Sequence, residues 1–496
     1  MDYDVVVVGG GTGGCVVAGR LGAAGLHVLL LEAGPRGPFP AVTDPGRMHE
    51  LWHGELDWDF QTVPQPAAHG RRLHLPRGRV VGGSHALNAM VWVRGNPVDY
   101  DTWAYLGNPG WAWSDVEPVF AALEDRDGAG PGPQPVLTDY RPDEIHASIV
   151  AAAVAAGVPF NPDYNSGRQD GVSFMQLTIR DGARVMTADA YLDLPSGDRP
   201  SGDRPEVRAG CLVDRLLVRG GRCHGVRYLR DGETVDVTAE RVVLTAGALG
   251  SPAILERSGI GDPAVLRAAG VEVQVGLPGV GANLQDHWLV PVVFSTVRPP
   301  QTSPGLPTTQ SHLFWRSDAA LPTPDVQPIH FAAPLLADWM LGPAQGFSLM
   351  AGLVRPASRG TVHLAAANPT IPPLVDPAVL SATSDVDTLV AAVRLCREIG
   401  RQAPLADAWG AEEIYPASFA DGEQSLHDYV RETVVTYHHQ AGTCALGPVV
   451  DPRLRVHGVS GLLVADASVM PTIVTGNTNA PVAMIAERAA EFVLKD

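Results

Sequence analysis

The apolar residues of the N-terminal segment fall into short unbroken runs separated by glycine. Residues 5–8 form a β-branched run with the length of a strand buried on both faces. Residues 12–21 predict a helix after a glycine-rich turn, and residues 27–31 predict a second buried strand that leads directly to Glu32. This order of strand, turn, helix and strand predicts a βαβ unit within an α/β fold.

The same patterns predict further elements along the chain. Residues 145–156 form an alanine-rich helix candidate, and residues 207–244 predict short strands joined by turns at Gly221, Gly225 and Gly232. These strands are expected to return to the first sheet.

Capping signals predict where two later helices begin and end. Residues 242–261 predict a strand that leads into a helix, with Ser251 as its cap, Pro252 in its first turn and Gly259 at its end. Asn479 is expected to cap the amphipathic C-terminal helix.

Other segments lack a strong period. The pentapeptide Ser-Gly-Asp-Arg-Pro occurs twice in residues 196–205 and predicts a polar surface loop. Residues 291–433 are proline-rich with short amphipathic strands, and we expect them to hold much of the substrate site. The residues expected in or near that site are His312, Trp315, His330, Phe331, Trp339 and Met350.

The glycine-rich turn carries the first functional signal. Gly9, Gly11 and Gly14 form Gly-x-Gly-x-x-Gly before a predicted helix, whose first N–H groups can hold a pyrophosphate. Glu32 follows the second strand, where a carboxylate can accept hydrogen bonds from a ribose 2′-OH. The pattern predicts a dinucleotide site, disfavours NADP because of the acid, and leaves FAD and NAD open.

Composition narrows the classes of partner. The 496 residues exceed what one core usually supports, so two domains or large insertions are expected. The formal net charge of −18 disfavours nucleic acid and anionic membranes, because both are repelled at long range. The five cysteines are scattered without Cys-x-x-Cys spacing, which favours reduced thiols and a cytoplasmic location. Neither an export signal nor a transmembrane helix is expected.

Longer stretches carry a family resemblance. Residues 77–95, taken with the first 34 residues, resemble the first signature of the glucose–methanol–choline (GMC) family of FAD-dependent oxidoreductases. Residues 242–261 are similar to the second signature of that family. Residues 96–103 and 107–111 also resemble family members, and a looser similarity extends to the C-terminus.

The resemblance implies a mixed α/β fold. A Rossmann-like FAD-binding domain is expected, with an interleaved substrate-binding domain built on an antiparallel sheet. The implied FAD-binding domain comprises residues 1–95, 200–292 and 434–496, with 35–79 as a lid or connecting segment, and the substrate-binding domain comprises 96–199 and 293–433.

The resemblance also implies the chemistry. His439 lies where the family carries its catalytic histidine, and Asn477 lies where members have a histidine or an asparagine. His439 would take the hydroxyl proton of an alcohol while hydride passes to flavin N5, and Asn477 would align the oxygen. The electrons would then pass to dioxygen or another acceptor. His438 is interpreted as a packing residue and residues 283–287 as structural.

Cofactor contacts follow from the same resemblance. Leu87 lies where some relatives carry the histidine that tethers FAD, so the flavin is expected to be non-covalent, although His85 occupies a position that is usually small. The implied contacts are Gly9, Gly11, Thr12, Gly14 and Glu32 for the adenine nucleotide, the backbone of Val213 for adenine, Asn88, Ala89, Met90 and Val91 beside the isoalloxazine ring, Asp466 and Ala467 near the pyrophosphate and ribityl chain, and Asn479 at the helix end that faces the flavin.

Two alternatives remain open from the sequence. A hydroxynitrile lyase of the same fold would keep the His439-type base without reducing its flavin, and an NAD-dependent dehydrogenase would be colourless. A metal centre is not predicted, because His-Glu-x-x-His is missing from the sequence, and a Gly-x-Ser-x-Gly hydrolase elbow is missing too. The alcohol, the acceptor and the oligomeric state stay open.

Overall fold

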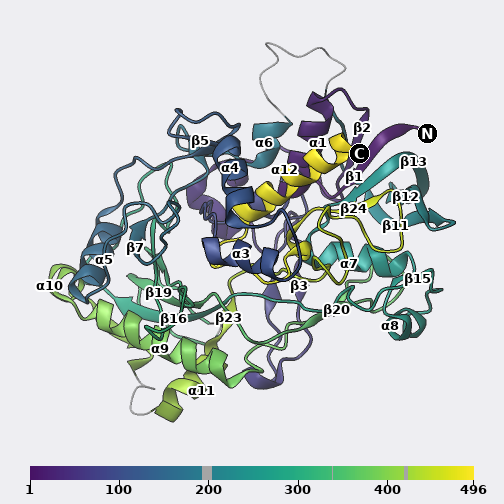
Figure 1. Cartoon of the computed structure of the whole chain (residues 1–496). Helices are drawn as coiled ribbons and strands as arrows, with labels where there is room; N and C mark the ends of the chain where they lie inside the picture. The colour runs from purple at the N-terminus through teal and green to yellow at the C-terminus, as the bar shows by residue number, and fades with distance from the viewer. Residues whose placement is uncertain (193–203, 338, 418–422) are drawn as a thin grey trace.

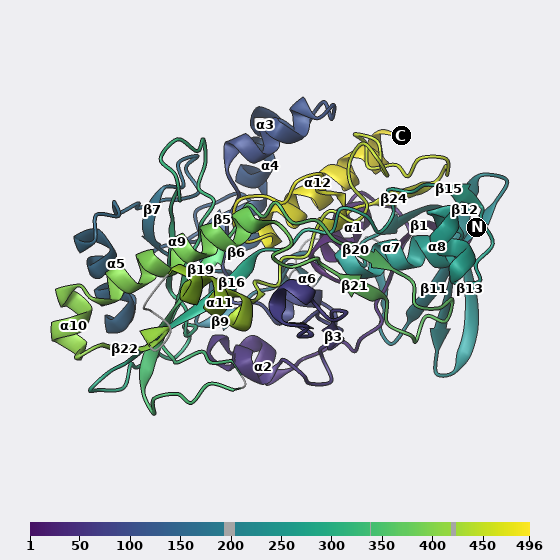
Figure 2. The same ribbon diagram turned by 90° about the horizontal axis from the view of Figure 1, so that it is seen from below.

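Two seven-stranded sheets organise the molecule and lie towards opposite ends of it (Figure 2). The computed structural model describes residues 1–192, 204–337, 339–417 and 423–496. Residues 196–203 of the repeated pentapeptide lie outside the described residues. Each sheet has its own large apolar core.

The first sheet is built around the buried N-terminal strand. Val6 pairs with Leu29 on one side and with Val242 on the other, all in parallel register. The long strand β13 continues beyond this parallel part and pairs there with β12 in antiparallel register. The strand order is β10 (Glu206–Arg208), β2 (Val28–Leu31), β1 (Tyr3–Val8), β13 (Glu233–Leu244), β12 (Arg222–Arg230) and β11 (Leu212–Arg219), with β24 (Leu462–Val464) also paired to β13.

The carboxyl ends of four parallel strands meet at one edge of this sheet. They deliver Gly9 after β1, Glu32 after β2, Thr245 after β13 and Asp466 shortly after β24. This edge of a parallel sheet is where α/β folds bind ligands.

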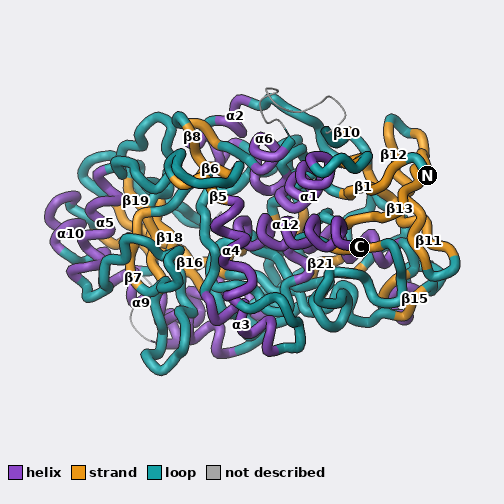
Figure 3. Tube along the Cα trace, turned by 45° about the horizontal axis from the view of Figure 1, so that its top comes forward, coloured by secondary structure: helices purple, strands orange, loops and turns teal. Residues whose placement is uncertain are grey.

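Helices from both ends of the chain cover this sheet. Helix α1 (Thr12–Ala23) and helix α12 (Asn479–Lys495) pack side by side (Figures 1 and 3). The Arg20–Glu487 ion pair, with Nε and Oε2 2.8 Å apart, joins them. Three further helices pack on this half: α4 (Trp113–Leu123), α6 (Thr187–Tyr191) and α7 (Gly247–Arg257).

The second sheet is antiparallel, as the resemblance implied. Helix α9 (Thr383–Gly400) packs along its central strands, and α5 (Glu144–Ala155), α10 (Ala403–Trp409) and α11 (Glu423–Thr433) lie around it (Figure 1). The strand order is β22 (Glu412–Tyr415), β16 (Trp288–Ser295), β19 (Gly346–Leu353), β18 (Ile329–Phe331), β17 (Ser311–Phe314) and β7 (Gly171–Phe174), with β23 (Val435–Thr436) also paired to β16.

Several local predictions are wrong. Helix α7 begins at Gly247, so Pro252 lies inside it and Ser251 is not its N-terminal cap. Gly225 lies within β12, where a Cβ would approach the carbonyl oxygen of Val237 to 2.0 Å, so this glycine allows close strand pairing and makes no turn. The left-handed residue Gly259 after α7, with φ +77°, is confirmed.

The predicted domain division stays a prediction. Strand β16 begins at Trp288 and β23 at Val435, so the antiparallel sheet includes residues on both sides of the expected boundaries at 292 and 434. Strand β23 ends three residues before His439.

Among the described residues, no helix combines the length and apolarity needed to cross a membrane. All five cysteines are described, and none forms a disulfide. The remaining elements are α2 (Pro40–Thr43), η1 (Pro45–Glu50), β3 (Phe60–Gln61), η2 (Pro66–Ala68), β4 (His74–Leu75), η3 (Gly83–Ala86), α3 (Pro97–Tyr105), β5 (Glu124–Arg126), β6 (Gln134–Val136), β8 (Ile179–Arg180), β9 (Ala183–Arg184), β14 (Ile260–Gly261), α8 (Pro263–Ala268), β15 (Val275–Gly276), β20 (Thr361–His363), β21 (Leu374–Asp376) and η5 (Ala467–Val469).

Candidate active site

The three glycines of the N-terminal turn have different roles. A Cβ at Gly9 would lie 2.6 Å from the carbonyl oxygen of Thr245, and a Cβ at Gly14 would lie 1.9 Å from that of Gly9. These two glycines therefore permit the packing of the turn itself. A Cβ at Gly11 would have Gly83 Cα at 3.8 Å as its single neighbour within 4 Å, so this position is open in the protein and suits close approach of a ligand.

The first turn of α1 is available to an anion. Gly11 is its N-cap residue, no side chain caps the helix, and no acidic residue lies in its first turn. Thr12 Oγ1 donates to Asn479 Oδ1 at 2.7 Å, and the buried Asn479 Nδ2 has no hydrogen-bond partner. The cap of α12 is Thr478, so the prediction that Asn479 caps it is wrong, and Asn479 instead offers a buried donor between the two helix starts.

Glu32 is buried beside the glycine turn, with 5% of its surface exposed. Its two carboxylate oxygens accept from the N–H groups of Gly10 at 2.7 Å and Gly34 at 2.8 Å. Burial raises the pKa of Glu32 to about 7, against the opposing effect of these N–H groups. The carboxylate thus shapes the turn directly, and its contact with a ribose stays a prediction.

Asp466 and Val213 are already engaged with protein groups. Asp466 accepts from Gly247 N at 2.9 Å, Ser251 Oγ at 2.6 Å and Ser468 N at 2.8 Å, so it anchors the starts of α7 and η5, and Ala467 is the first residue of η5. Val213 lies at an irregularity of β11, and its carbonyl accepts from Arg257 at 3.3 Å. Their cofactor contacts stay predictions.

The segment expected beside the isoalloxazine ring is held by a buried arginine. Arg184 donates through Nη1 to the carbonyls of His85 and Asn88 and to Asn88 Oδ1, at 2.7–2.9 Å. Asn88 Oδ1 also accepts from Met90 N at 2.9 Å, which leaves its Nδ2 as the group for a ring edge. Met90 is in the left-handed region with φ 59°. Met90 and Val91 are buried, whereas Asn88 and Ala89 are partly exposed.

His85 has both ring nitrogens occupied. Nδ1 accepts from Thr187 N at 3.2 Å, so in the neutral ring Nε2 carries the proton and donates to Thr178 Oγ1 at 3.0 Å. Burial lowers the pKa of His85 to about 3. These bonds favour the prediction of a non-covalent flavin, because neither nitrogen is free to attack one.

His439 lies shortly after β23 and is 8% exposed. Its N–H donates to Asp286 at 2.8 Å, and its Nδ1 lies 2.9 Å from Nδ1 of His287. The ring of Tyr437 stacks on the imidazole with centroids 4.6 Å apart. Burial is the main cause that lowers the pKa of His439 well below its ordinary value, so the imidazole is neutral at pH 7 and offers a lone pair.

Asn477 lies against the other nitrogen of this ring, and the structure thus brings the two predicted catalytic residues together. Asn477 Nδ2 is 3.3 Å from His439 Nε2, and Asn477 Oδ1 accepts from Gln327 Nε2 at 3.0 Å. Because an amide nitrogen only donates, Asn477 presents a donor to His439 Nε2, and that nitrogen carries the lone pair. The ring proton is then on Nδ1, where it is donated to His287.

The segment interpreted as structural, residues 283–287, contacts the imidazole directly. Asp286 accepts from the backbone of His439 and from the side chains of Thr436 and Gln440. Burial raises the pKa of Asp286 to about 6. The segment therefore sets the position of His439, a role that its sequence alone did not reveal.

His438 has the contacts of a packing residue. Its carbonyl accepts from Arg77, and its ring meets the ring of Trp52 edge-on with centroids 5.0 Å apart. Burial lowers the pKa of His438 to about 3.

One group of described residues has the side chains of a metal site. His53 Nδ1 and His74 Nε2 lie 2.8 Å and 3.0 Å from the same carboxylate oxygen of Asp59. The two imidazoles stack with centroids 3.7 Å apart, and His74 Nε2 also lies 3.1 Å from Asp57 Oδ2, so carboxylates of the protein already engage both rings. The arrangement is that of two imidazoles sharing a carboxylate, and the proposed chemistry does not use it.

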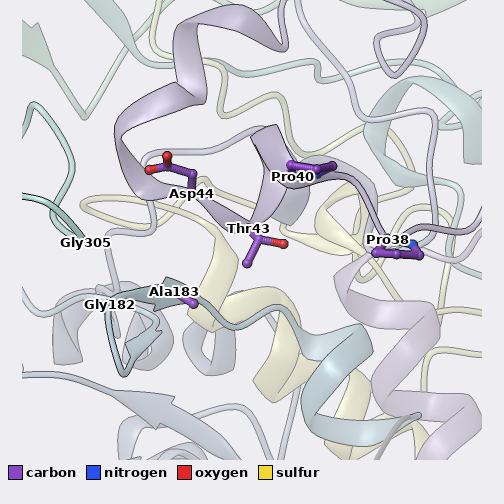
Figure 4. A pocket seen from close by; sticks show the side chains of 7 residues that line it. All are labelled: Pro38, Pro40, Thr43, Asp44, Gly182, Ala183 and Gly305. Carbon is purple, nitrogen blue, oxygen red and sulfur yellow. The ribbon is translucent and has the colours of Figure 1, made fainter.

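A separate open hollow of about 470 Å³ lies between α2 and β9 (Figure 4). Arg184, next to its wall residue Ala183, donates to the carbonyl of Val42 at 2.8 Å and so ties this wall to the Asn88 segment. None of the predicted site residues lines it. Its lining residues are Pro38, Pro40, Thr43, Asp44, Gly182, Ala183 and Gly305.

Comparison with known families agrees with this geometry. The two family profiles described as GMC oxidoreductase match residues 3–289 and residues 356–486. The chain belongs to the GMC oxidoreductase family. Pyridoxine 4-oxidase of Microbacterium luteolum is 35% identical over 98% of this chain and 98% of its own length. Mitochondrial choline dehydrogenase of Mus musculus is 36% identical over 99% of this chain and 89% of its own length.

Solved structures share the whole fold of this GMC oxidoreductase. Pyridoxine 4-oxidase from Mesorbium loti superposes with a TM-score of 0.92 at 34% identity, covering 99% of this chain and 98% of that one. Formate oxidase from Aspergillus oryzae superposes with a TM-score of 0.92 at 25% identity, with the same coverage. The chain is thus an FAD-dependent oxidoreductase, and its open Gly11, uncapped α1 and unpaired Asn479 Nδ2 fit a bound dinucleotide.

Sequence reasoning missed three residues of this GMC site: His287, Gln327 and Arg184. His287 lies in a stretch that resembles the family, so its histidine was a usable signal. Gln327 and Arg184 belong to no motif, and only the fold brings them to Asn477 and Asn88.

Proposed function

We propose that this GMC oxidoreductase oxidises the CH–OH group of an alcohol to the carbonyl, with His439 as the base and Asn477 as the group that orients the hydroxyl. The single observation that carries the proposal is the pair Asn477 Nδ2 and His439 Nε2, 3.3 Å apart, one a donor and the other a lone pair. A substrate hydroxyl between them accepts from the amide and donates to the imidazole.

The surroundings keep the base in its working state. The buried imidazole is neutral before the reaction, because its pKa is lowered by burial. When Nε2 takes the hydroxyl proton, Nδ1–H keeps its bond to His287, and Asp286 lies 2.8 Å from the His439 backbone N–H. FAD, when bound, supplies the acceptor for the hydride that leaves the carbinol carbon.

The charge of the site favours an uncharged alcohol. The side chains that contact the His439 imidazole and the Asn477 amide are His287, Tyr437 and Gln327. Burial keeps this histidine neutral and raises the pKa of this tyrosine well above its usual value. A quaternary ammonium is held by open aromatic faces, and the Tyr437 ring is already stacked on the imidazole of His439, so pyridoxine, the substrate named for two relatives, is a better candidate than choline.

An anaerobic reduction screen tests the proposal. Purified enzyme is mixed without oxygen with pyridoxine, an aryl alcohol, an aliphatic alcohol and choline, and the visible flavin absorbance is followed. We expect bleaching, fastest with uncharged alcohols, and re-oxidation by air distinguishes dioxygen from another acceptor. A flavin that no alcohol bleaches would overturn the proposal and return the non-redox lyase, which the named relatives do not favour.

A further inference from the structure

We propose that Gln327 is a positioning residue that sets the direction of the hydrogen bonds reaching the base, by holding the Asn477 amide with its nitrogen towards His439. The inference rests on the proposed function in so far as His439 is the base. Gln327 belongs to the antiparallel half of the molecule and lies outside both signatures of the resemblance.

The backbone of Gln327 is fixed independently of the active site. Its N–H donates to the carbonyl of Gly352 at 2.8 Å, and a Cβ at Gly352 would lie 2.1 Å from the Gln327 carbonyl oxygen. The two backbones can come this close because residue 352, on β19, is a glycine. The side chain, which is fully buried, therefore starts from backbone that is hydrogen-bonded to β19.

The side chain links two acceptors. Gln327 Nε2 lies 3.0 Å from Asn477 Oδ1 and 3.1 Å from His312 Nδ1. The chain of contacts continues through Asn477 Nδ2 to His439 Nε2 and through His439 Nδ1 to His287 Nδ1. All the rings are neutral, since burial lowers the pKa of His287 and His312 to about 3 and that of His439 as well.

The donors and acceptors along such a chain of hydrogen bonds can be arranged in two directions, and only one of them leaves the base ready for catalysis. In the first, Gln327 donates to both neighbours, Asn477 donates to His439, and Nε2 of the base is a lone pair. In the reverse, Gln327 presents its oxygen, Asn477 turns its own oxygen to His439, and Nε2 must carry a proton. The base then has no lone pair for the substrate.

The end of this hydrogen-bond chain at His287 favours the first direction. The carbonyls of Val354 and Val474 act on the imidazole of His287 and partly offset the fall of its pKa. His287 Nε2 is buried, and no hydrogen bond of good geometry reaches it. Because Nδ1 of His287 is turned to His439, we assign the proton that these carbonyls favour to Nε2, and His287 Nδ1 is then the acceptor.

An isosteric substitution reverses the direction. In Gln327→Glu the ionised carboxylate only accepts, so Asn477 must present Nδ2 to it and Oδ1 to His439. The protonated carboxyl can still donate to Asn477 and restores the working direction. We therefore expect the variant's rate of flavin reduction, relative to wild type, to fall at least about 10-fold as the pH rises through the pKa of the introduced carboxyl group, up to the ~10² share of a general base.

Two matched variants separate this effect from others. Gln345→Glu, a half-buried glutamine that donates to the Thr296 carbonyl, controls for the added charge and should keep a wild-type pH profile. Gln327→Met fills the space without donating or accepting, and should lower the reduction rate at every pH with little change in substrate affinity.

Nitrogen NMR of histidine-labelled holoenzyme gives a readout without substrate. We expect His439, identified by loss of its signals in His439→Gln, to carry its proton on Nδ1 in wild type and on Nε2 in Gln327→Glu at high pH. If no alcohol reduces the flavin, this measurement still decides the inference separately from the proposed function.

Three results would overturn the inference: a pH-independent ratio for Gln327→Glu, an unchanged His439 tautomer, or wild-type reduction by Gln327→Met. If Gln327→Glu does not fold with FAD, Gln327→Met decides, because an unchanged rate in that variant removes Gln327 from any positioning role.

Discussion

The glycine edge of the parallel sheet and the His439–Asn477 pair are two parts of the proposed site, but they are specified differently. At the edge, the backbone comes so close to itself that a Cβ at Gly14 would lie 1.9 Å from a carbonyl oxygen. At the pair, the arrangement depends on which group donates each hydrogen bond: Gln327 donates to Asn477, and Asn477 donates to His439. Added volume should therefore break the first region, and exchange of donor for acceptor should break the second.

The largest effect is expected for Gly14→Ala. The added methyl group meets Gly9 O and Thr245 Oγ1 at 1.9 and 2.8 Å, so backbone must move. We expect the free energy of unfolding to fall by more than the ~1–3 kcal/mol that is typical of overpacking. The result would be insoluble protein or a strongly lowered melting temperature. A variant that melts like wild type would show that the turn is less tightly packed than described.

His439→Ala should leave the fold and FAD content intact and reduce turnover by about 10²- to 10⁴-fold, the usual share of a general base. The measurement is anaerobic flavin reduction at saturating alcohol. His457→Ala, an exposed histidine of the same C-terminal segment, is the matched control and should reduce its flavin at the wild-type rate. An unchanged rate in His439→Ala would remove this residue from the mechanism.

Acid should act on the buried histidines and on the buried carboxyl groups with opposite sign. Seven buried histidines, His85, His146, His287, His312, His330, His438 and His439, have lowered pKa values, so only the unfolded chain takes up protons as the pH falls below about 6.5. Each of these histidines lowers the free energy of unfolding by about 1.4 kcal/mol for every pH unit below that value. Burial raises the pKa of Glu32 to about 7, that of Asp286 to about 6, and those of Asp99 and Asp466 as well, so the contribution of these carboxyl groups is present at low pH and is lost as the pH rises.

Because the seven histidines outnumber these four carboxyl groups, the free energy of unfolding should fall by several kcal/mol between pH 6.5 and pH 5. Urea unfolding at the two pH values measures the total, and hydrogen exchange shows where protection is lost. We expect the loss at β17 to β19 before the β1 to β2 turn. A free energy of unfolding that stays level over this range would contradict the neutral state of the buried rings.

Gly11→Ala should have the smallest effect on the protein alone. Its methyl group meets a neighbour at 3.8 Å, an ordinary contact, so the apoprotein should melt as wild type does. The same methyl group lies where we predict that the pyrophosphate approaches the backbone, and we expect FAD to dissociate about 10-fold more readily, or ~1.4 kcal/mol. Wild-type FAD affinity would mean that the dinucleotide passes elsewhere.

The same contrast explains what could be predicted from the sequence. The βαβ unit, the antiparallel second sheet and the meeting of His439 with Asn477 follow from local patterns and from the resemblance. The sequence predicts that α7 starts at Pro252 instead of Gly247, because Ser251 and Pro252 carry cap signals that the fold uses inside the helix. Ser251 bonds Asp466, which is 215 residues away, and no local rule reveals such a partner.

The remaining gaps are of the same kind. Gln327 reaches Asn477 across 150 residues, and Arg184 reaches Asn88 across 96. Both bonds depend on the relative placement of distant strands and loops. Periodicity places elements, whereas polar side chains that span elements become visible only once the chain is folded.

Helix α12 and the glycine turn lie at nearly opposite ends of the printed chain, yet Thr12 and Asn479 share a hydrogen bond and Arg20 meets Glu487. During synthesis the glycine turn therefore leaves the ribosome long before Asn479 and Glu487 exist. The contacts between α1 and α12 stay unmade until these residues have been synthesised. A nascent chain stalled before residue 479 should therefore lack one side of the predicted dinucleotide site.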